Sequence, residues 1–176
     1  MSQREEIEKY LEKYAGDVYP MQYVTPRFQT GGFLSAKAVK HAIRSYAAGA
    51  AENEVLGLLD TTLTGNGKEG FLFTDTMAYY KDSGKQGEFV YKDIRSVEVD
   101  DEDEDPKTSL YIYTKDGEEY EWRSRMMNKV PMVHFFQEVI AYFEEQEKKK
   151  EEKIIKSEVS NDAEKQVSDL FARLTQ

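Results

Sequence analysis

Apolar residues near the N-terminus recur with the period of an α-helix. They form one face of residues 4–15, consisting of Ile7, Tyr10, Leu11 and Tyr14. Gly16 follows, where a helix commonly ends. We therefore predict a short amphipathic helix at the start of the chain.

The next segment, residues 16–32, has no regular period and contains two prolines and three glycines. We expect an irregular arm here, whose Tyr19, Tyr23 and Phe28 pack onto the rest of the chain. Helical spacing returns in residues 35–50, where Ser35 suits the N-cap position and the apolar face lies opposite a basic and polar one. This pattern predicts a second amphipathic helix.

The period then shortens to that of β-strands. Short runs rich in β-branched and aromatic residues are 55–62, 70–75, 77–81, 88–91, 96–99, 109–114 and 118–123. Between them lie GNGKEG, KDSGKQG, DDEDEDP and KDGE, which are sequences typical of turns. Seven short strands in succession predict a small antiparallel barrel or sandwich.

A long apolar helical stripe follows the strands. Asn128 suits its N-cap, Pro131 is tolerated in its first turn, and the stripe consists of Met132, Val133, Phe136, Val139, Ile140 and Phe143. A stripe this broad needs a large apolar partner, which one face or the open end of the barrel would supply. The helix is predicted to run on through EEQEKKKEEK, whose charged residues surround it on all sides, so this end is expected to be solvated or frayed. Residues 148–176 are assigned to a charged, flexible linker and a terminal helix.

The last residues predict a separate terminal helix. Asn161 and Glu164 have the spacing of a capping box, and Val167, Leu170, Phe171 and Leu174 share one helical face. A short amphipathic helix at the end of a charged linker is suited to binding a protein partner or a second copy of the chain. We expect the protein-interaction surface there.

Composition narrows the classes of function. The 176 residues include no cysteine, which excludes disulfides, thiolate zinc sites and cysteine nucleophiles. The charged N-terminus lacks the features of a signal peptide, so we expect a soluble, cytoplasmic protein. Of the formal net charge of −10, residues 98–105 supply seven carboxylates, leaving −3 for the other residues. No basic stripe with interleaved aromatic residues is present, which argues against nucleic-acid binding.

The glycine-rich segment LTGNGKEG, residues 63–70, invites comparison with phosphate-binding loops. Counting back from Gly67 and Lys68 puts Thr62 where a Walker A motif needs its first glycine, and Glu69 stands where a hydroxyl residue belongs. Gly65, Gly67 and Gly70 match GxGxxG, but FLFT follows and predicts a strand rather than the helix of a dinucleotide-binding unit. The segment is interpreted as a glycine-rich hairpin turn.

Two stretches resemble a known family. EVLGLLDTTLTGNGKEGFLFTDTMAYY, residues 54–80, and YKDIRSVEV, residues 91–99, are similar to bacterial pleckstrin-homology (PH)-like domains. The resemblance covers residues 52–147 and implies an α+β, mostly β fold. Its expected form is a PH-like seven-stranded antiparallel barrel capped by a C-terminal helix. Residues 1–51 would add N-terminal helices and the aromatic arm, and residues 148–176 the charged linker and amphipathic tail.

The resemblance also implies where a lipid would bind, since PH domains bind inositol phosphates at the loop between their first two strands. That loop offers Lys68. The other basic residues that the fold would have to bring near it are Lys81, Lys85, Lys92 and Arg95. Several cations must converge on a phosphate, because one exposed ammonium gives little affinity in salt.

Other candidate sites have simpler interpretations. The acidic run from Asp100 to Asp105 is clustered like calcium ligands but lacks the alternation and glycine of an EF-hand, so a solvated loop or a docking segment for a basic partner is favoured. His41 and His134 lie on separate helices without a nucleophile motif and are expected to be packing or surface residues. Trp122, Tyr111 and Tyr113 are expected in strands.

These patterns favour a non-enzymatic binding or scaffolding protein that uses neither a cofactor nor a metal. The favoured activity is protein–protein interaction, with an unknown partner or by self-association. Sensing of a membrane surface through Lys68 and its neighbours is the alternative, and an enzyme of unknown type is the second alternative. Fold resemblance alone does not choose among them, because this fold supports several functions.

Overall fold

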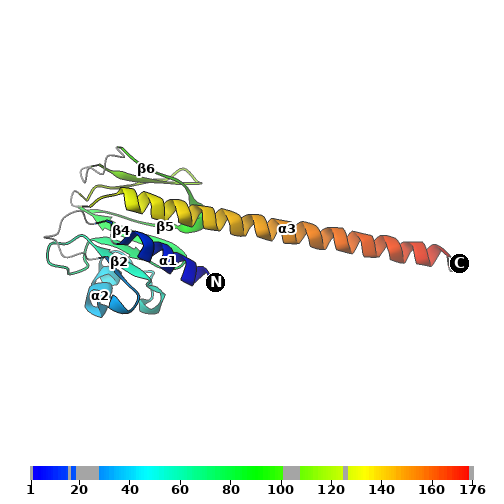
Figure 1. Ribbon diagram of the computed structural model, residues 1–176, viewed down its shortest axis with the longest axis horizontal. Helices are drawn as coiled ribbons and strands as arrows, with labels where there is room; N and C mark the ends of the chain where they lie inside the picture. The colour runs from blue at the N-terminus through cyan, green and yellow to red at the C-terminus, as the bar shows by residue number, and fades with distance from the viewer. Residues whose placement is uncertain (1, 16, 19–27, 101–107, 125–126, 175–176) are drawn as a thin grey trace. The chain divides into compact units, whose positions relative to one another are not determined.

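The computed structural model describes residues 2–15, 17–18, 28–100, 108–124 and 127–174, with Ala15 and residues 158–174 described by backbone only. The chain divides into two compact units, Met1–Ile140 and Ala141–Gln176. The N-terminal helices and the strands therefore belong to one unit (Figure 1).

The described residues form an α+β fold with two antiparallel sheets. The helices are α1 (Gln3–Ala15), α2 (Ala36–Ser45) and α3 (Val130–Leu174), with 3-10 turns η1 (Gly31–Phe33), η2 (Glu52–Glu54) and η3 (Tyr91–Asp93). The five-stranded sheet has the order β1 (Phe28–Thr30), β2 (Gly57–Asp60), β3 (Gly70–Phe73), β4 (Met77–Asp82) and β5 (Lys85–Val90). The three-stranded sheet has the order β6 (Ile94–Val99), β7 (Leu110–Thr114) and β8 (Glu119–Trp122).

The centre of the five-stranded sheet is buried on both faces, which explains why β2 and β3 are continuous apolar runs rather than alternating ones. Cross-strand register places Leu58, Leu72 and Tyr79 in one row. This row packs with the apolar face of α2, including Val39 and Ala42. The second predicted helix thus covers one face of the sheet.

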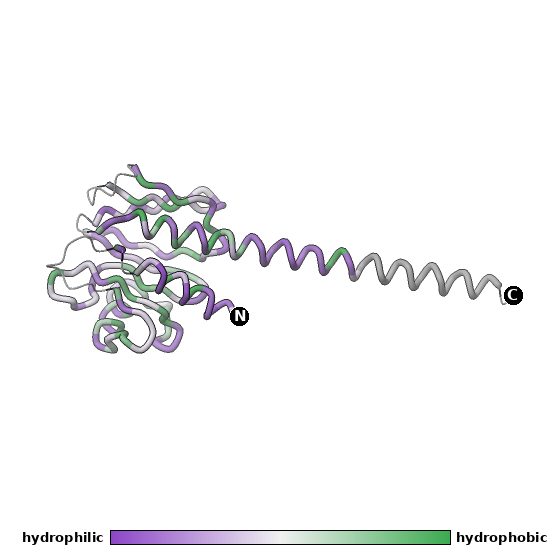
Figure 2. Tube along the Cα trace, in the orientation of Figure 1, coloured by the Kyte–Doolittle hydropathy of each residue, from purple (hydrophilic) through white to green (hydrophobic). Residues whose placement is uncertain are grey.

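The opposite face carries the aromatic core. Phe71 meets Trp122 of the other sheet edge-to-face at 4.9 Å, and Phe73 meets Phe135 of α3 at 5.4 Å. Phe136 packs beside Phe135 at 4.9 Å. The start of α3 therefore lies against the five-stranded sheet, and Figure 2 colours its apolar residues green among purple polar ones. The predicted stripe is confirmed for Met132, Val133, Phe136 and Val139, which are buried, but the prediction missed Phe135.

The first helix also packs within this unit. Ile7 and Leu11 of α1 are fully buried, and the Leu11 side chain lies beside Gly57 of β2. Tyr14 donates a hydrogen bond to Glu138 of α3 at 2.7 Å, and Lys13 contacts the same carboxylate. The apolar face of α1 is therefore covered by its own chain.

Two expectations about the strands need correction. The seven predicted strands correspond to β2 through β8, but Phe28, assigned to an irregular arm, begins an eighth strand, β1, opposite Leu59. Phe28 also stacks on Phe73 at 5.7 Å, so tertiary packing selects the extended conformation of FQT. Tyr19 and Tyr23 lie outside the described residues. Among the described strands, no ladder joins the two sheets into a closed barrel.

The predicted charged linker is also wrong, because α3 continues through it as one helix of 45 residues. The helix begins at Val130, so Lys129 rather than the predicted Asn128 holds the N-cap position, and the Asn128 side chain accepts the Val130 N–H at 3.0 Å. Within the charged segment, Glu145 and Lys149 pair at 2.6 Å with the favourable i,i+4 spacing. Glutamate and lysine are good helix formers, which explains why the helix continues without the flexible linker that was predicted before the terminal helix.

Candidate functional site

The loop between β2 and β3 is built around a buried carboxylate. Asp60 is 1% exposed and accepts hydrogen bonds from the Thr62 N–H at 2.9 Å, the Thr62 hydroxyl at 2.6 Å and the Gly67 N–H at 2.7 Å. The Thr62 hydroxyl in turn accepts the Asn66 N–H at 3.0 Å. The glycine-rich turn therefore folds onto a protein carboxylate, whereas a phosphate-binding loop would leave its N–H groups for a phosphate.

Glycine is required at Gly67 for two reasons. Its φ of +71° lies in the left-handed region, and a Cβ there would come within 2.3 Å of the Ala38 carbonyl oxygen. The loop backbone thus lies directly against the first turn of α2. This close approach couples the loop to a helix that lies outside residues 52–147.

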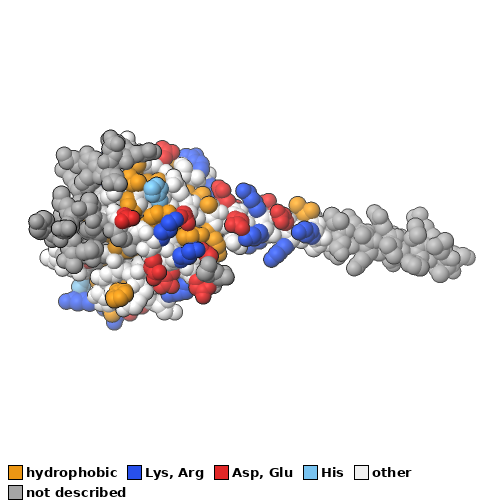
Figure 3. All heavy atoms as spheres, in the orientation of Figure 1, with side chains coloured by type: hydrophobic (Ala, Val, Ile, Leu, Met, Phe, Trp, Pro, Cys, Tyr) orange, Lys and Arg blue, Asp and Glu red, His pale blue; other side chains and the backbone are white. Residues whose placement is uncertain are grey.

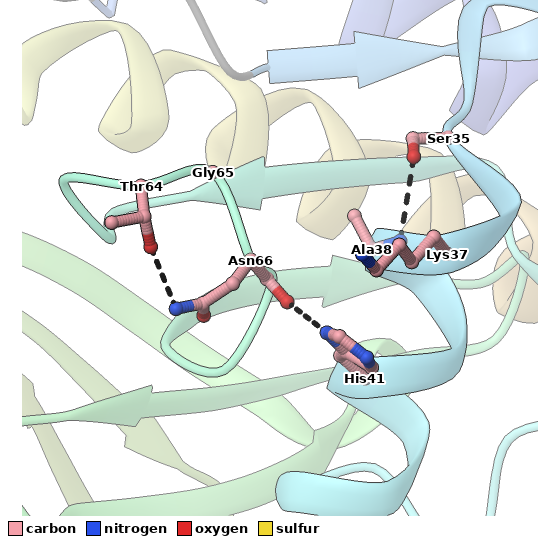
Figure 4. A pocket seen from close by; sticks show the side chains of 7 residues that line it. All are labelled: Ser35, Lys37, Ala38, His41, Thr64, Gly65 and Asn66. Atoms are coloured by element: carbon pink, nitrogen blue, oxygen red, sulfur yellow. Dashed lines mark hydrogen bonds between the residues drawn. The ribbon is translucent and has the colours of Figure 1, made fainter.

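Side chains of α2 hold the same loop by its carbonyl groups. A ring nitrogen of His41 lies 2.7 Å from the Asn66 carbonyl oxygen, and the Ser45 hydroxyl donates to the Lys68 carbonyl at 3.0 Å. Figure 4 shows the resulting hollow, with Ser35 and Lys37 on the helix side and Thr64 and Gly65 on the loop side. A second shallow hollow is lined by His41, Arg44, Ser45 and Lys68.

The structure brings together only two of the five basic residues predicted for an anion or lipid site. The Lys81 ammonium donates to the Ser45 hydroxyl at 3.1 Å, and Ser45 also bonds the backbone of Lys68, so Lys68 and Lys81 share a location. Lys85 instead pairs with Glu121 at 2.8 Å. Lys92 lies 3.9 Å from Asp93. Arg95 lies over the ring of Tyr113, 5.8 Å from its centroid.

Glu121 is the centre of a separate polar cluster on β8. It accepts hydrogen bonds from Lys85 at 2.8 Å and Ser109 at 3.1 Å, and Arg123 contacts the same carboxylate. The hydrogen bonds from Arg123 and Lys85 lower the pKa of Glu121 to about 2. The cluster joins β5 to β8 and so links the edges of the two sheets.

A third hollow lies between β5 and the β7–β8 hairpin. Met77, Phe89 and Tyr120 form its apolar lining, and Glu88, Asp93 and Asp116 are its carboxylates. Burial raises the pKa of Tyr120 to about 12, and its hydroxyl donates to Glu118 at 2.7 Å. No three His, Asp or Glu side chains among the described residues are grouped as a metal site.

The two histidines lie apart, and each makes a packing contact. His41 is half-buried against the β2–β3 loop, and the exposed His134 lies with its ring 5.9 Å from that of Tyr14. Trp122 is fully buried, as expected of a strand residue facing the core. Tyr111 and Tyr113 stack on β7 at 6.4 Å and are half-buried.

The acidic run lies mostly outside the described residues, which resume at 108. Its first described member, Asp100, accepts a long hydrogen bond of 3.5 Å from the Tyr111 hydroxyl. The predicted interaction residues Val167, Leu170, Phe171 and Leu174 belong to α3, where the backbone alone is described.

Sequence reasoning missed the contribution of α2 to this site. The basic face of the helix was visible from its period, yet nothing local showed that Arg44 and Ser45 would lie beside Lys68 and Lys81. Two strongly exposed apolar side chains, Phe33 of η1 and Leu63 of the β2–β3 loop, were also not singled out. Comparison with protein-family models, curated proteins and solved structures finds no match. Of the described helices, none has an apolar stretch long enough to cross a membrane.

Proposed function

We propose that this chain is a non-enzymatic binding or scaffolding protein that acts through protein–protein interaction. We further propose that residues 52–147 form a PH-like domain. The order of the elements supports that proposal, since β2 to β5 and β6 to β8 form two consecutive antiparallel meanders and a helix follows them. The packing of Phe135 and Phe136 onto these strands supports it as well.

The binding element that we assign is the second unit, Ala141–Gln176. The observation that carries this assignment is a pair of adjacent isoleucines, Ile154 and Ile155, which are 56% and 59% exposed. They lie on a helix whose other described side chains in that region are mostly Glu and Lys, drawn red and blue in Figure 3. A helix in a protein gains most of its stability when its apolar face is buried, so a bound partner that covered the exposed isoleucines would stabilise this helix.

The apolar residues continue toward the C-terminus in the sequence. Val167, Leu170, Phe171 and Leu174 follow at helical spacing in the same helix. We propose that they form the main contact with an unknown protein or with a second copy of the chain. The N-terminal helices are not needed for this role, because α1 and α2 bury their apolar faces on the strands.

The experiment compares the full chain with a variant carrying Val167→Ser, Leu170→Ser and Leu174→Ser. The matched control is Lys148→Ser, Lys150→Ser and Lys153→Ser, three polar positions in the same helix. Light scattering measures self-association, and affinity capture with mass spectrometry identifies bound proteins. We expect one defined partner, or self-association, that the apolar variant loses and the control retains.

A chain that stays monomeric and binds no protein specifically would overturn the proposal. Equal binding by the apolar variant and the full chain would overturn the assignment of the helix. Fluorescence of Trp122, the single tryptophan, reports separately that the first unit is folded in each variant.

A further inference from the structure

Two aromatic rings lie on the outer face of the three-stranded sheet. Burial alternates along β7, where Leu110, Ile112 and Thr114 are buried. Tyr111 and Tyr113, which stand between them, are half-buried and point to the opposite face. Their rings stack with centroids 6.4 Å apart. Figure 1 shows β6, the neighbour of β7, at the edge of the first unit far from α2, so this face is distinct from the hollow of Figure 4.

The contacts of both tyrosine side chains stay within this sheet and its ends. The Tyr111 hydroxyl lies within hydrogen-bond distance of Glu121, at 3.4 Å, and of Asp100, at 3.5 Å. The Tyr113 ring lies beside the Arg95 guanidinium. In the described part of the chain, these two side chains make no other ring contact or hydrogen bond apart from stacking on each other. No described helix therefore takes part in these contacts.

Carboxylates flank the two rings on the neighbouring strands. The register places Glu98 of β6 opposite Tyr111, and Glu119 of β8 stands opposite Tyr113. Opposed residues of antiparallel strands turn their side chains to the same face. Both carboxylates are exposed, and among the described residues neither lies within ion-pair distance of a cation. Desolvation, followed by the charges of Glu119 and Glu98, raises the pKa of Tyr113. Two carboxylates without a cationic partner therefore stand beside the rings.

Arg95 shows which chemical group this face accepts. Its guanidinium carbon lies 5.8 Å from the centroid of the Tyr113 ring, within the range of a cation–π contact. Arg95 is exposed, and no described carboxylate lies within ion-pair distance of it. The described residues place no cation over the ring of Tyr111. One ring therefore holds a cation from the chain itself, and the other, beside Glu98, is open to a cation from a partner.

We propose that the outer face of the three-stranded sheet binds an extended segment of a partner protein that carries arginine at alternate positions. We call this surface the β6–β8 face and define it by Glu98, Tyr111, Tyr113 and Glu119. Side chains two residues apart in an extended segment lie on one side, about 6.6 Å apart, and the two ring centroids are 6.4 Å apart. Each ring can therefore take one guanidinium, and the one over Tyr113 displaces Arg95. Arginine suits the face better than lysine, because its planar guanidinium stacks on an aromatic ring and forms paired hydrogen bonds with a carboxylate.

A basic partner fits this face better than an anionic one. A phosphate or a carboxylate would be repelled by Glu98 and Glu119, whereas a guanidinium is attracted by both carboxylates and by the rings. The net charge of −10 on the chain also draws cationic segments toward it. This interaction goes beyond the contact proposed for the second unit, and it does not depend on the apolar residues of α3.

The experiment is an NMR titration of the isotope-labelled full chain with two synthetic peptides in about 20 mM salt. The first peptide, Ser-Arg-Ser-Arg-Ser-Ser, places both arginines on one side of an extended chain. The second, Ser-Arg-Ser-Ser-Arg-Ser, has the same composition but places them on opposite sides. We expect the first peptide to shift amide signals of β6, β7 and β8 and to bind at least about threefold more tightly, since only it brings a cation to each ring. Binding should weaken in about 0.5 M salt, because the charges are screened.

Two charge variants test the location. Glu98→Lys with Glu119→Lys should weaken binding of the first peptide at least about tenfold, because two attractions become repulsions. The control, Glu12→Lys with Asp17→Lys, makes the same change in net charge near the end of α1, where both residues are exposed. It should bind the peptide as the unaltered chain does. Fluorescence of Trp122 checks that each variant is folded.

Three single substitutions test the contact between cation and ring. Tyr111→Leu removes the ring but keeps an apolar side chain, and it should weaken binding of the first peptide about threefold. Tyr111→Phe keeps the ring and should bind as the unaltered chain does. Arg95→Gln removes the competing cation and should strengthen binding about threefold. A gain of affinity at Arg95 is an effect that a purely structural role of these residues would not produce.

Several outcomes would contradict the proposal. They are equal affinity for the two peptides, equal loss in the charge control, amide shifts confined to other strands, and absence of binding at about 1 mM peptide. Tighter binding to anionic vesicles or to a phosphorylated peptide would contradict it as well. The variant with Val167→Ser, Leu170→Ser and Leu174→Ser should still bind the first peptide, so a failure of the contact proposed for α3 is distinguishable from a failure here.

Discussion

The buried carboxylate of Asp60 should be the main stabilising contact of the β2–β3 loop. Replacing it with alanine removes the acceptor for the Gly67 N–H, which is buried, and for the two donors of Thr62, which is half-buried. A buried N–H without a partner costs about 1–3 kcal/mol, whereas water can reach the half-buried donors and limit their cost to about 1 kcal/mol. We therefore expect Asp60→Ala to lower the free energy of unfolding by about 3 kcal/mol.

Urea unfolding followed by Trp122 fluorescence measures this loss in the first unit alone, because Trp122 is the single tryptophan and is buried there. The midpoint of thermal unfolding should fall by roughly 10 °C, since each kcal/mol shifts it by about 3–4 °C in a domain of this size. Hydrogen exchange should show the Gly67 amide losing protection in the variant. Asp93→Ala is the control, because its carboxylate is only in a surface pair with Lys92, and it should change stability by less than about 0.5 kcal/mol.

If Asp60→Ala lowered the free energy of unfolding by less than about 1 kcal/mol, with an unchanged slope of that free energy against urea concentration, this reasoning would be refuted. Unchanged protection of the Gly67 amide would do the same, because it would show that another group satisfies that donor. Asp60→Asn separates shape from charge. The amide oxygen of the asparagine still accepts from Thr62, but its NH₂ group faces the Gly67 N–H, so two donors meet. We therefore expect the free energy of unfolding to fall by about 2 kcal/mol.

Four further outcomes are expected. Gly70→Ala should lower the free energy of unfolding, measured with urea, by more than about 2 kcal/mol, because the added Cβ would lie 1.8 Å from a backbone oxygen. The control Gly84→Ala has open space around its Cβ and should lower it by about 1 kcal/mol through its positive φ alone. Phe135→Ala should cost about 3–5 kcal/mol by the same measurement. Glu121→Gln should lower the free energy of unfolding by about 1 kcal/mol at neutral pH. Because the pKa of Glu121 in the folded protein is lowered to about 2, this difference in stability between the variant and the unaltered chain should be fully present above about pH 4.5. It should disappear as the pH falls toward 2, where the folded protein takes up the proton. Lys150→Pro should reduce helical circular dichroism while leaving Trp122 unfolding unchanged, and an unchanged helical signal would contradict a continuous α3.

Most of the secondary structure is a local property of the sequence. The Ser35 cap is present, with its side chain accepting the Ala38 N–H, and seven of the strands lie where alternation and turn residues predicted them. These features depend on neighbours within a few residues, so the sequence displays them directly. The continuous α3 is also local in origin, but helix propensity and the Glu145–Lys149 pair prevailed over the absence of an apolar face.

Contacts between distant segments decided the rest. Phe28 is extended because Leu59 and Phe73 lie beside it, and α2 is buried because a row of residues from β2, β3 and β4 covers its apolar face. The candidate site has the same origin: His41 meets Asn66 across 25 positions, and Lys81 meets Ser45 across 36. Composition and period determined which segments are helical, extended or charged. Tertiary structure decided which cations share a surface, because that depends on the packing of α2 against the sheet.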